Sequence, residues 1–389
     1  MPSAFLTADF IHDGHRFLEA GSVLEVAENG SVIDIHKSQE IPAATHYPGV
    51  LLPGFVNAHC HLELFHLKDA IPEGTGLIPF LQGVTGLRNG FSELEKEAAR
   101  KSAYDELVQN GIVAVGDICN TDETLGLRML DQMHMHSFIE CIGFTETHAA
   151  ARLTHSRNLL QQFSQQKSVG KTLRQSIVPH APYSVSPTLF RLISDTESNS
   201  LISIHNQECA AENEYYLTKS GAVCDLLSGF GIDDSFFVPS GKSSLQTYLP
   251  LIDERHPIIF VHNTFSSEED FRFAESRHGQ SFWCLCPNAN LYIEGRLPDI
   301  AMMQSLTDNI CIGTDSLASN KQLSIWAELL TLKTTLPELE WEDLFRWATL
   351  NGARALQFDH LVGSFKKGTQ PGILNITDLS QNGKLTRIF

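Results

Sequence analysis

Short, continuous apolar runs recur along most of the chain, and a stretch long enough for a helix separates each run from the next. Continuous rather than alternating apolar runs are typical of strands in a parallel sheet that is buried on both faces. Eight such runs in succession predict the α/β class and a closed (β/α)8 barrel, the TIM barrel. The runs cover residues 51–58, 112–116, 138–144, 176–179, 201–204, 257–261, 281–285 and 310–313.

The segments between the runs carry signals for helices. Ser92 is followed three residues later by Glu95, and this capping-box pattern predicts a helix over residues 93–109. Gly111 then ends that helix. The last long helical stretch is predicted over residues 341–356. These segments provide the outer layer of helices that a parallel barrel requires.

The two ends of the chain have a different pattern. Residues 22–26 and 31–35 alternate between apolar and polar side chains around a turn-forming Glu-Asn-Gly, which predicts a small β-meander. The Gly/Pro-rich C-terminal tail again contains short strand-like segments. We therefore expect residues 1–50 and 358–389 to pair into one small β-sandwich domain, beside a barrel that spans residues 51–357.

The overall charge restricts the choice of partners. With 28 basic and 46 acidic side chains among 389 residues, the formal net charge is −18. This charge repels the phosphates of nucleic acids and anionic membrane surfaces, so neither is expected as a partner. The first twenty residues lack a basic region followed by a long apolar one, and no apolar run reaches about 18 residues. We expect a soluble, cytoplasmic protein.

The cysteines do not form the pattern of a disulfide-stabilised or zinc-finger domain. Eight of them are scattered along the chain without a secretory signal, which predicts free thiols. Cys284 and Cys286 are separated by a single residue, which is the wrong spacing for a zinc knuckle.

The polar residues that follow the apolar runs indicate chemistry. In barrels of this type, reactive groups lie just beyond the C-terminal ends of the strands. Residues of the kinds that bind zinc follow several of the runs. They are His59 and His61 after the first run, His180 after the fourth, His205 after the fifth, His262 after the sixth and Asp315 after the eighth. The sequence therefore predicts a metal site at this end of the barrel.

The His59-Cys60-His61 segment is the strongest single signal. In an extended chain, residues i and i+2 point the same way, so both imidazoles can reach one ion at about 2.0–2.1 Å. In a chain with 17 histidines an isolated pair is more often chance, but its position after the first run favours a metal. Asp315, taken alone, reads as a helix cap or a turn residue. Opposite the two histidines, it would complete the site.

Three further residues could belong to the predicted metal site or have a purely structural role. His205 and Glu208, three residues apart, offer a ligand and an acid that can lean over the same site. The alternative for Glu208 is a cap on the following helix. His262, taken alone, is more often a histidine of the core, and only its place after the sixth run favours a role in the site.

Other residues near the predicted mouth of the barrel are candidates for substrate binding. His180 and Tyr183 flank a stiff proline turn, and packing is an equally good explanation for them. Asp117 and Glu140, on or beyond the second and third strands, are ranked as structural acids. The candidates for substrate binding are Glu63, Arg88, His180 and Tyr183.

Five motifs follow one another along the chain: HCHLE at 59–63, HAPYS at 180–184, HNQE at 205–208, His262 and GTDSLASN at 313–320. Taken together and in order, they resemble the amidohydrolase superfamily. The resemblance is to the branch that holds adenosine-type, guanine and cytosine deaminases and the triazine chlorohydrolases. More narrowly, the first motif is similar to that of aminodeoxyfutalosine and S-adenosylhomocysteine-type deaminases. The acidic residue of the family's closing Ala-Asp-Leu motif is absent from residues 370–375, which leaves the subgroup open but not the chemistry.

The resemblance implies one divalent metal rather than two, because no lysine ends the fourth strand as it does in two-metal members. Zinc is the expected ion, and iron(II) is the alternative. The resemblance also implies that Glu208 moves protons, that His262 orients the water or polarises the substrate, and that Asp315 accepts the proton of the water. The expected reaction is hydrolytic deamination of an aminated purine or a related nucleoside, and a homodimer is the expected assembly. The implied metal ligands are His59, His61, His205 and Asp315.

Two alternatives stay open at this point. The first is hydrolysis of another carbon–nitrogen or carbon–halogen bond, as in imidazolonepropionase-like or chlorohydrolase members. The second, from a different class, is a metal-binding scaffold without catalysis. A substrate panel scored for ammonia, chloride and ring-opened product distinguishes the first alternative from deamination. The Glu208→Gln variant distinguishes the second: an enzyme should lose turnover and keep its metal, whereas a scaffold has no turnover to lose.

Overall fold

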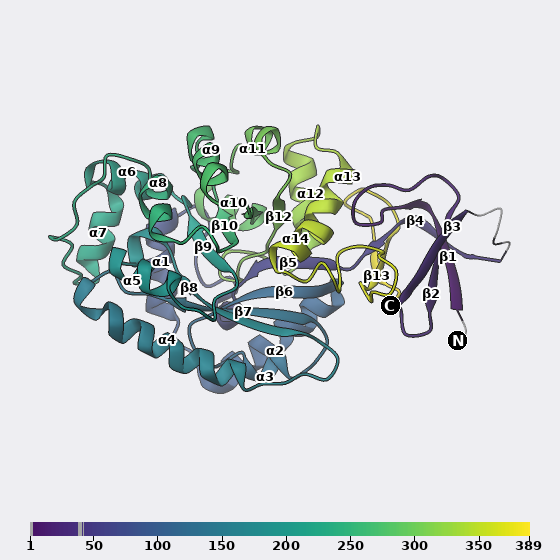
Figure 1. Cartoon of the computed structure of the whole chain (residues 1–389), viewed down its shortest axis with the longest axis horizontal. Helices are drawn as coiled ribbons and strands as arrows, with labels where there is room; N and C mark the ends of the chain where they lie inside the picture. The colour runs from purple at the N-terminus through teal and green to yellow at the C-terminus, as the bar shows by residue number, and fades with distance from the viewer. Residues whose placement is uncertain (1–2, 38–40, 42) are drawn as a thin grey trace.

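The computed structural model describes residues 3–37, 41 and 43–389. Figure 1 shows a barrel surrounded by helices at one end of the molecule and a separate sheet at the other end, where both termini lie. Within the described parts of the chain, no helix is both long and apolar enough to cross a membrane. The arrangement confirms the predicted fold class, an α/β barrel with a smaller β-structure built from both ends.

The barrel consists of parallel strands in two hydrogen-bonded sheets, and backbone contacts close it on both sides. Cys60 forms a parallel bridge with Asp315 on one side. On the other side, the His205 backbone N–H donates to the His180 carbonyl at 3.0 Å. The strands are β5 (Phe55–Cys60), β6 (Ile112–Cys119), β7 (His134–Cys141), β8 (Leu173–Pro179), β9 (Ile202–Asn206), β10 (Ile258–His262), β11 (Ser281–Leu285) and β12 (Ile310–Ile312).

Burial on both faces explains the continuous apolar runs. On one face of β10, Phe260 stacks on Trp283, which in turn stacks on Phe271 of the covering helix α9 (Glu268–Arg277). Ile259 and Val261, the alternate residues of the same strand, belong to a second buried apolar cluster. Neither face of the strand meets water, so both faces carry apolar side chains.

The predicted run over residues 51–58 is divided between two sheets. Its first residues belong to β4 (Thr45–Pro53), which pairs in the terminal sheet, and the barrel strand β5 begins at Phe55. Gly54 joins the two strands at a point of close backbone approach, where a Cβ atom would lie 2.7 Å from the Pro371 carbonyl oxygen. An apolar run by itself does not show where a chain leaves one sheet and enters another.

The third strand also differs from the prediction over residues 138–144, because β7 begins at His134 and ends at Cys141. The first residues of β7 are polar, and they were therefore missed. They are buried nevertheless, and His136 Nε2 lies 3.0 Å from Ser176 Oγ on β8. A hydrogen bond to the neighbouring strand offsets the cost of burying such a group.

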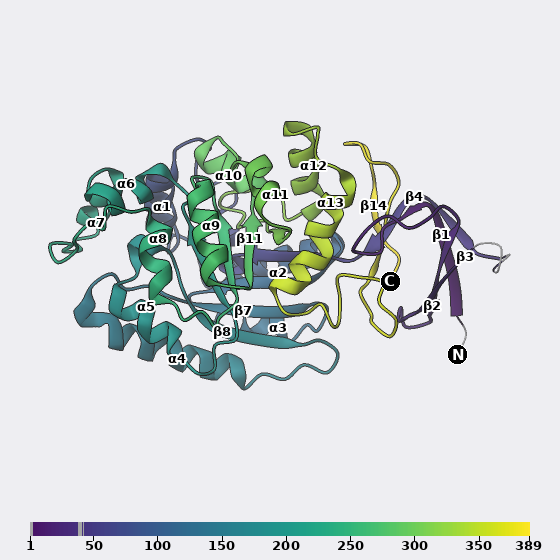
Figure 2. The same ribbon diagram turned by 45° about the horizontal axis from the view of Figure 1, so that its top comes forward.

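Helices fill the connections between the strands (Figure 2). The helix predicted over residues 93–109 is confirmed with its capping box, since the Ser92 backbone N–H donates to Glu95 Oε2 at 2.8 Å. The helical stretch predicted over 341–356 is formed by α13, a π-helical turn at Trp347–Asn351, and α14.

The α-helices are α1 (Leu77–Leu87), α2 (Glu93–Gln109), α3 (Leu125–Arg128), α4 (Ala149–Ser164), α5 (Pro187–Ser194), α6 (Ala210–Thr218), α7 (Ala222–Gly229), α8 (Ser244–Tyr248), α9, α10 (Pro287–Glu294), α11 (Ile300–Leu306), α12 (Ile325–Thr335), α13 (Trp341–Arg346) and α14 (Gly352–Ala355). Short 3-10 turns lie at Leu62–Leu67, Glu146–His148, Pro182–Ser184 and Leu249–Leu251. All of these elements connect strands of the barrel or follow its last strand.

The terminal sheet has the strand order β14-β13-β4-β1-β2-β3. Its antiparallel β2–β3 pair is the predicted meander, and Gly30 in the turn has a positive φ of 80°. The domain boundaries at 50/51 and 357/358 stay a prediction. The strands of this sheet are β1 (Ser3–Ile11), β2 (Ser22–Ala27), β3 (Val32–Lys37), β4, β13 (Ile373–Ile376) and β14 (Leu385–Arg387).

All eight cysteines lie in described parts of the chain and are free thiols, as predicted. Cys60 points away from the predicted metal site and accepts a hydrogen bond from Thr314 Oγ1 at 3.7 Å. Burial raises the pKa of the Cys60 thiol well above its usual value, so it stays protonated and packs as a small apolar group.

Candidate metal centre and substrate cavity

Four side chains from the ends of three barrel strands bring one donor atom each to a common point. His59 lies on β5 and His61 directly follows it, His205 lies on β9, and Asp315 follows β12. The His61 Nε2 atom lies 3.1 Å from the Nε2 atoms of both His59 and His205. Asp315 Oδ1 lies 3.5 Å from His59 Nε2 and 3.3 Å from His61 Nε2. The side chains named as metal ligands from the sequence therefore converge.

The spacing and the protonation of these atoms fit one metal ion. Tetrahedral coordination with ligand distances of about 2.0–2.1 Å places the ligand atoms about 3.3–3.4 Å apart. His61 Nε2 carries at most one hydrogen, so it could donate to only one of its two histidine neighbours. Burial lowers the pKa of His61 to about 3 and that of His205 well below its usual value, so both are neutral, the form that binds metal. The site can hold a divalent metal ion.

Hydrogen bonds orient these side chains. His205 Nδ1 lies 2.9 Å from the His180 carbonyl oxygen, which can only accept, so Nδ1 carries the hydrogen and Nε2 keeps its lone pair. The Asp315 backbone N–H donates to the His59 carbonyl at 3.1 Å, and its Oδ2 atom accepts from Ser319 Oγ. These bonds hold the donor atoms in place.

Several residues at these strand ends have left-handed backbone conformations. The φ angles are 45° at Gln207, 73° at His262, 59° at Asn263 and 56° at Asp315. Such a conformation costs a non-glycine residue about 1–3 kcal/mol, and it persists only where the surroundings enforce it. Here the chain turns sharply as each strand leaves the barrel, and at His262 and Asp315 the side chain faces the cavity.

Glu208 and His262 lie side by side next to the donor atoms, with 3.6 Å between His262 Nε2 and Glu208 Oε1. Burial, reinforced by the charge of Asp315, raises the pKa of Glu208 well above its usual value. Burial lowers the pKa of His262 to about 4. These shifts favour the protonated form of the carboxyl group and the neutral form of the imidazole, which places a proton donor beside a hydrogen-bond acceptor.

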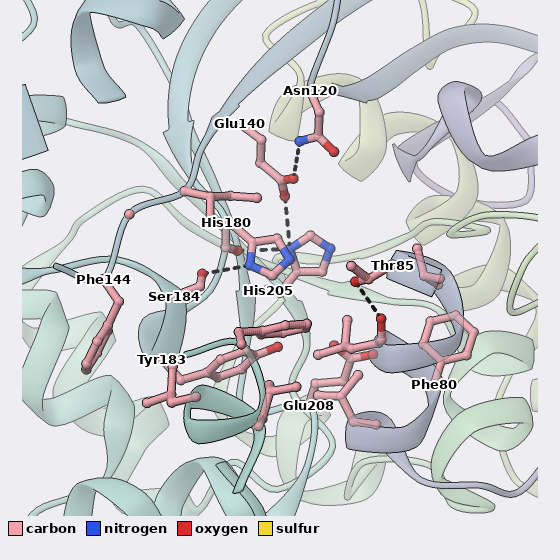
Figure 3. A pocket seen from close by; sticks show the side chains of 18 of the residues that line it. Phe80, Thr85, Asn120, Glu140, Phe144, His180, Tyr183, Ser184, His205 and Glu208 are labelled. Atoms are coloured by element: carbon pink, nitrogen blue, oxygen red, sulfur yellow. Dashed lines mark hydrogen bonds and ion pairs between the residues drawn. The ribbon is translucent and has the colours of Figure 1, made fainter. Parts of the chain in front are cut away.

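A cavity of about 440 Å³ opens over these groups. Of the residues predicted to bind substrate, Arg88, His180 and Tyr183 line the cavity, and Figure 3 shows His180 and Tyr183 beside His205. His59 is fully buried. The cavity wall near the donor atoms is formed by His61, His205, Glu208, His262 and Asp315.

Glu63, also predicted to bind substrate, is not among the residues that line the cavity. Its carboxylate accepts from Arg88 at 3.0 Å, from the Asn120 backbone N–H at 3.1 Å and from Thr121 Oγ1 at 2.8 Å. Glu63 therefore holds Arg88 and the loop after β6, and Arg88 itself faces the cavity.

Glu140, which the sequence ranked as structural, lies on the cavity wall (Figure 3). One of its carboxylate oxygens accepts from Asn120 Nδ2 at 2.7 Å, and the other lies 3.4 Å from His205 Nδ1. It shares a strand face with His136 and Phe138, and this period of two was the available signal. Asp117, in contrast, accepts from the Leu62 backbone N–H at 3.1 Å and supports the chain behind the site.

A barrel with a His/Asp donor set at its strand ends and a proton-carrying acid beside it defines the class of metal-dependent hydrolases. The chain belongs to the amidohydrolase family, because the model of that family matches residues 50–388. A curated relative, the adenosine deaminase of Helicobacter pylori, is 28% identical over 322 residues, which cover 80% of this chain and 75% of the relative. The family resemblance expected from the motifs is thus confirmed, and the chain is a hydrolase.

Solved structures share the fold over nearly the whole chain. The Helicobacter pylori aminofutalosine deaminase in complex with methylthio-coformycin aligns with a TM-score of 0.81 and 21% identity, and covers 98% of this chain and 93% of that one. An adenosine deaminase from Xanthomonas campestris with bound zinc aligns with a TM-score of 0.73 and 20% identity, covering 97% of this chain and 85% of that one. At these identities the likeness establishes the fold.

Proposed function

We propose that the chain catalyses hydrolytic deamination of an adenine-type nucleoside with one divalent metal ion. The observation that carries this proposal is the convergence of the donor atoms of three histidines, with Asp315 Oδ1 within 3.5 Å of two of them. The cavity above them also presents the Glu208 carboxyl group, whose pKa is raised, and the His262 imidazole, whose pKa is lowered. The names of the relatives, which are deaminases, support it. The proposed metal ligands are His59, His61, His205 and Asp315.

A metal bound there would supply hydroxide at neutral pH, because coordination lowers the pKa of water from about 15.7 to about 7. Imidazole and carboxylate donors in a set of four suit zinc, and we propose zinc as the ion. The zinc in the Xanthomonas campestris relative is in line with this choice. Iron(II) accepts the same donor types, so metal analysis of the purified protein decides between the two.

Each proton transfer has a side chain assigned to it. Glu208 donates its proton to the ring nitrogen next to the carbon that bears the amino group. Asp315 accepts one proton of the attacking water and passes it to the amino nitrogen, which leaves as ammonia, and the hydroxyl proton left on the carbon's new oxygen returns to Glu208. His262 accepts a hydrogen bond that orients the water. One carbon–nitrogen bond breaks and one carbon–oxygen bond forms, so adenine-type substrates become hypoxanthine-type products.

A substrate panel tests this reaction. Zinc-loaded protein is given adenine, adenosine, cytosine and a chlorinated triazine, and ammonia, chloride and ring-opened products are measured. We expect ammonia from the aminopurine nucleoside and its loss after chelation of the metal. Release of chloride or a ring-opened product alone would show that the deaminase proposal is wrong. No turnover of any substrate would favour the metal-binding scaffold.

Two further properties are proposed on the family resemblance and the sequence alone. We propose a homodimer, for which light scattering would give a mass of about twice 43.2 kDa. A mass near 43.2 kDa at micromolar concentration would contradict it. A cytoplasmic location stays a prediction from the sequence and calls for localisation of the tagged protein in cells.

A further inference from the structure

Glu328 is a buried acid that the proposed reaction does not use. It lies on α12, is completely buried, and is not among the residues that line the cavity. Burial of an ionisable group is costly unless its oxygens are hydrogen-bonded, so the partners of Glu328 show what the residue holds in place.

The carboxyl group of Glu328 accepts hydrogen bonds from the segments that follow two neighbouring barrel strands. Its Oε2 atom accepts from the Asn288 backbone N–H at 2.8 Å, and its Oε1 atom accepts from Asn288 Nδ2 at 3.0 Å. Oε1 also accepts from Asn320 Nδ2 at 2.7 Å. Asn288 lies on α10, just after β11, and Asn320 lies in the loop after β12. Glu328 therefore joins the ends of these two strands from outside the barrel.

Asn320 extends this contact to the proposed metal ligand Asp315. Its Nδ2 group has two hydrogens, and it donates to Glu328 Oε1 and to the Thr314 carbonyl, the latter at 2.9 Å. The Thr314 carbonyl and the Asp315 N–H belong to one planar peptide unit, and that N–H donates to the His59 carbonyl at 3.1 Å. The peptide unit before Asp315 is thus held at both of its polar groups.

The orientation of this peptide unit determines where the Asp315 carboxylate points. Rotation of the unit changes the φ angle of Asp315, which is 56° and lies in the left-handed region. A non-glycine residue keeps such a strained conformation only where its surroundings enforce it. A relaxed φ angle would move Asp315 Oδ1 away from His59 Nε2 and His61 Nε2, which now lie at 3.5 Å and 3.3 Å.

The Asn320 amide has to be held in one orientation to restrain this unit. An amide turned by half a rotation would present its oxygen to the Thr314 carbonyl, and two acceptors repel each other. Glu328 Oε1 accepts from the same Nδ2 group. Only one orientation of the amide therefore satisfies both contacts, and Glu328 selects it.

We propose that Glu328 is a positioning residue for the metal site, because it holds, through Asn320, the peptide unit that sets the direction of Asp315. This inference rests on the proposed metal-dependent function. The competing explanation is that Glu328 only joins α12 to α10 through Asn288 and stabilises the fold. The two explanations differ in the metal affinity that they predict for variants.

The zinc affinity of the whole protein, measured by competition with a chelator, tests the proposal. Glu328→Met keeps the length of the side chain but has no oxygen to accept hydrogen bonds, and we expect its zinc affinity to fall by about 10–100-fold. Asn320→Ala should lower the affinity to a similar extent. The double variant should lose little more than the larger single loss, because both residues act through one contact.

Asn351→Ala is the matched control at the opposite end of β12. Asn351 is also buried, and its Nδ2 group donates to the carbonyls of Asp308 at 2.7 Å and Ile310 at 2.8 Å. This variant should unfold at a lower temperature and bind zinc with unchanged affinity. If it loses as much zinc affinity as Glu328→Met, any loosening of β12 disturbs the site, and the proposal is wrong.

Steady-state kinetics at saturating zinc provide a second measurement. Asp315 is the proposed acceptor of the proton of the water, whereas Glu328 does not line the cavity. Glu328→Met should therefore lower kcat by about tenfold or more and leave KM unchanged. A raised KM with an unchanged kcat would assign the effect to substrate binding and overturn the proposal.

The remaining outcomes separate this proposal from the deaminase function. Folded Glu328→Met protein with unchanged zinc affinity would overturn the positioning role. If Glu328→Met does not fold, Asn320→Ala decides by the same criterion. The affinity measurement needs no turnover, so the expected losses of affinity together with no ammonia from any substrate would contradict the deaminase function and leave the role of Glu328 intact.

Discussion

The two ends of the cavity are built differently. At the metal end, the donor side chains stand at the ends of barrel strands, and backbone hydrogen bonds and left-handed conformations hold them in place. The other end is built from α1, from α7 with the loop that follows, and from the loop after β7, and it carries exposed apolar side chains that nothing covers within the described chain. We call it the apolar lobe; it is lined by Phe80, Val84, Ile142, Phe144, Leu227 and Phe230. The reaction therefore depends on the barrel framework, whereas the choice of substrate depends on the connections between strands.

This separation has a physical basis. Strand ends are restrained by hydrogen bonds to both neighbours, so they can hold donor atoms at the 3.1–3.5 Å spacing that a metal ion requires. An apolar group needs only a surface of suitable shape, because the hydrophobic effect has no direction. Changes at the metal end should therefore have large effects on turnover, and changes at the rim of the lobe should have small effects on stability.

The largest effect is expected for Glu208→Gln at the metal end. The amide keeps the shape of the side chain but has no acidic proton, so kcat should fall by about 10²–10⁴-fold. The metal content should stay unchanged, because Glu208 is not among the four converging donors. Ammonia release and elemental analysis measure the two quantities. Glu214→Gln, an exposed position on α6, serves as the control. Turnover equal to that of the unaltered protein would exclude Glu208 as the acid.

Glu212→Gln tests the structure that connects the two ends. Glu212 lies on α6, accepts from the Gln207 backbone N–H at 3.0 Å and from Ser244 Oγ, and is completely buried. Burial raises its pKa from 4.5 to about 7. Between these two values the folded chain holds a proton that the unfolded chain has released, so this group's contribution to stability is lost as the pH rises through about 7.

The expected loss is about 3 kcal/mol between pH 5 and pH 8, since each pKa unit corresponds to about 1.4 kcal/mol. Glu212→Gln cannot ionise, so this part of the pH dependence should disappear. Urea unfolding of both proteins at the two pH values measures the difference. If the variant and the original protein lose the same free energy of unfolding over this interval, the carboxyl group is not the source.

A smaller effect is expected for Glu140→Gln beside His205, a proposed metal ligand. The carboxylate increases the basicity of that imidazole, and loss of such a neighbour weakens metal binding by about 10–100-fold. Titration against a competing chelator measures the affinity. Glu275→Gln is the control, because Glu275 accepts from Trp283 Nε1 at 3.1 Å outside the cavity. An unchanged metal affinity with a raised KM would assign Glu140 to substrate binding instead.

The smallest effect is expected for the stability of Phe230→Ala at the rim of the lobe. A side chain that is 47% exposed loses little packing on truncation, so the free energy of unfolding should change by less than about 0.5 kcal/mol. Thermal unfolding checks this value. A cost above about 2 kcal/mol would mean that Phe230 is part of the folded core, and the contrast between the two ends would then be weaker.

The parts of the fold that were predicted correctly depend on local patterns. The strand β11 coincides with its apolar run, and α2 coincides with its capping box, because period and cap are both encoded within a few residues. The start of β7 was missed because His134 and His136 are polar, and their burial depends on a neighbouring strand. The division at Gly54 was missed because the run is apolar on both sides of it.

Prediction of the site residues from the sequence has the same limit, because it depends on local patterns. The histidines after the first and fifth runs were identified because their residue type and position are visible in the sequence. The positions of Glu63 and Glu140 relative to the cavity were not identified, because their hydrogen-bond partners lie far from them in the sequence. Glu63 is bonded to Arg88 and Thr121, and Glu140 to Asn120, at separations of 20 to 58 residues.

The sequence by itself determined the barrel, the residue types at its strand ends and the family, since each follows from short-range order and motifs. Only the tertiary structure decided the distances between donor atoms, the isolation of Glu63 from the cavity, and the apolar lobe. These depend on closure of the barrel, which brings Asn57 Nδ2 within 2.8 Å of Thr314 Oγ1 across 257 residues. Such contacts form only when all eight strands pack together, because burial, and not local preference, brings distant segments into contact.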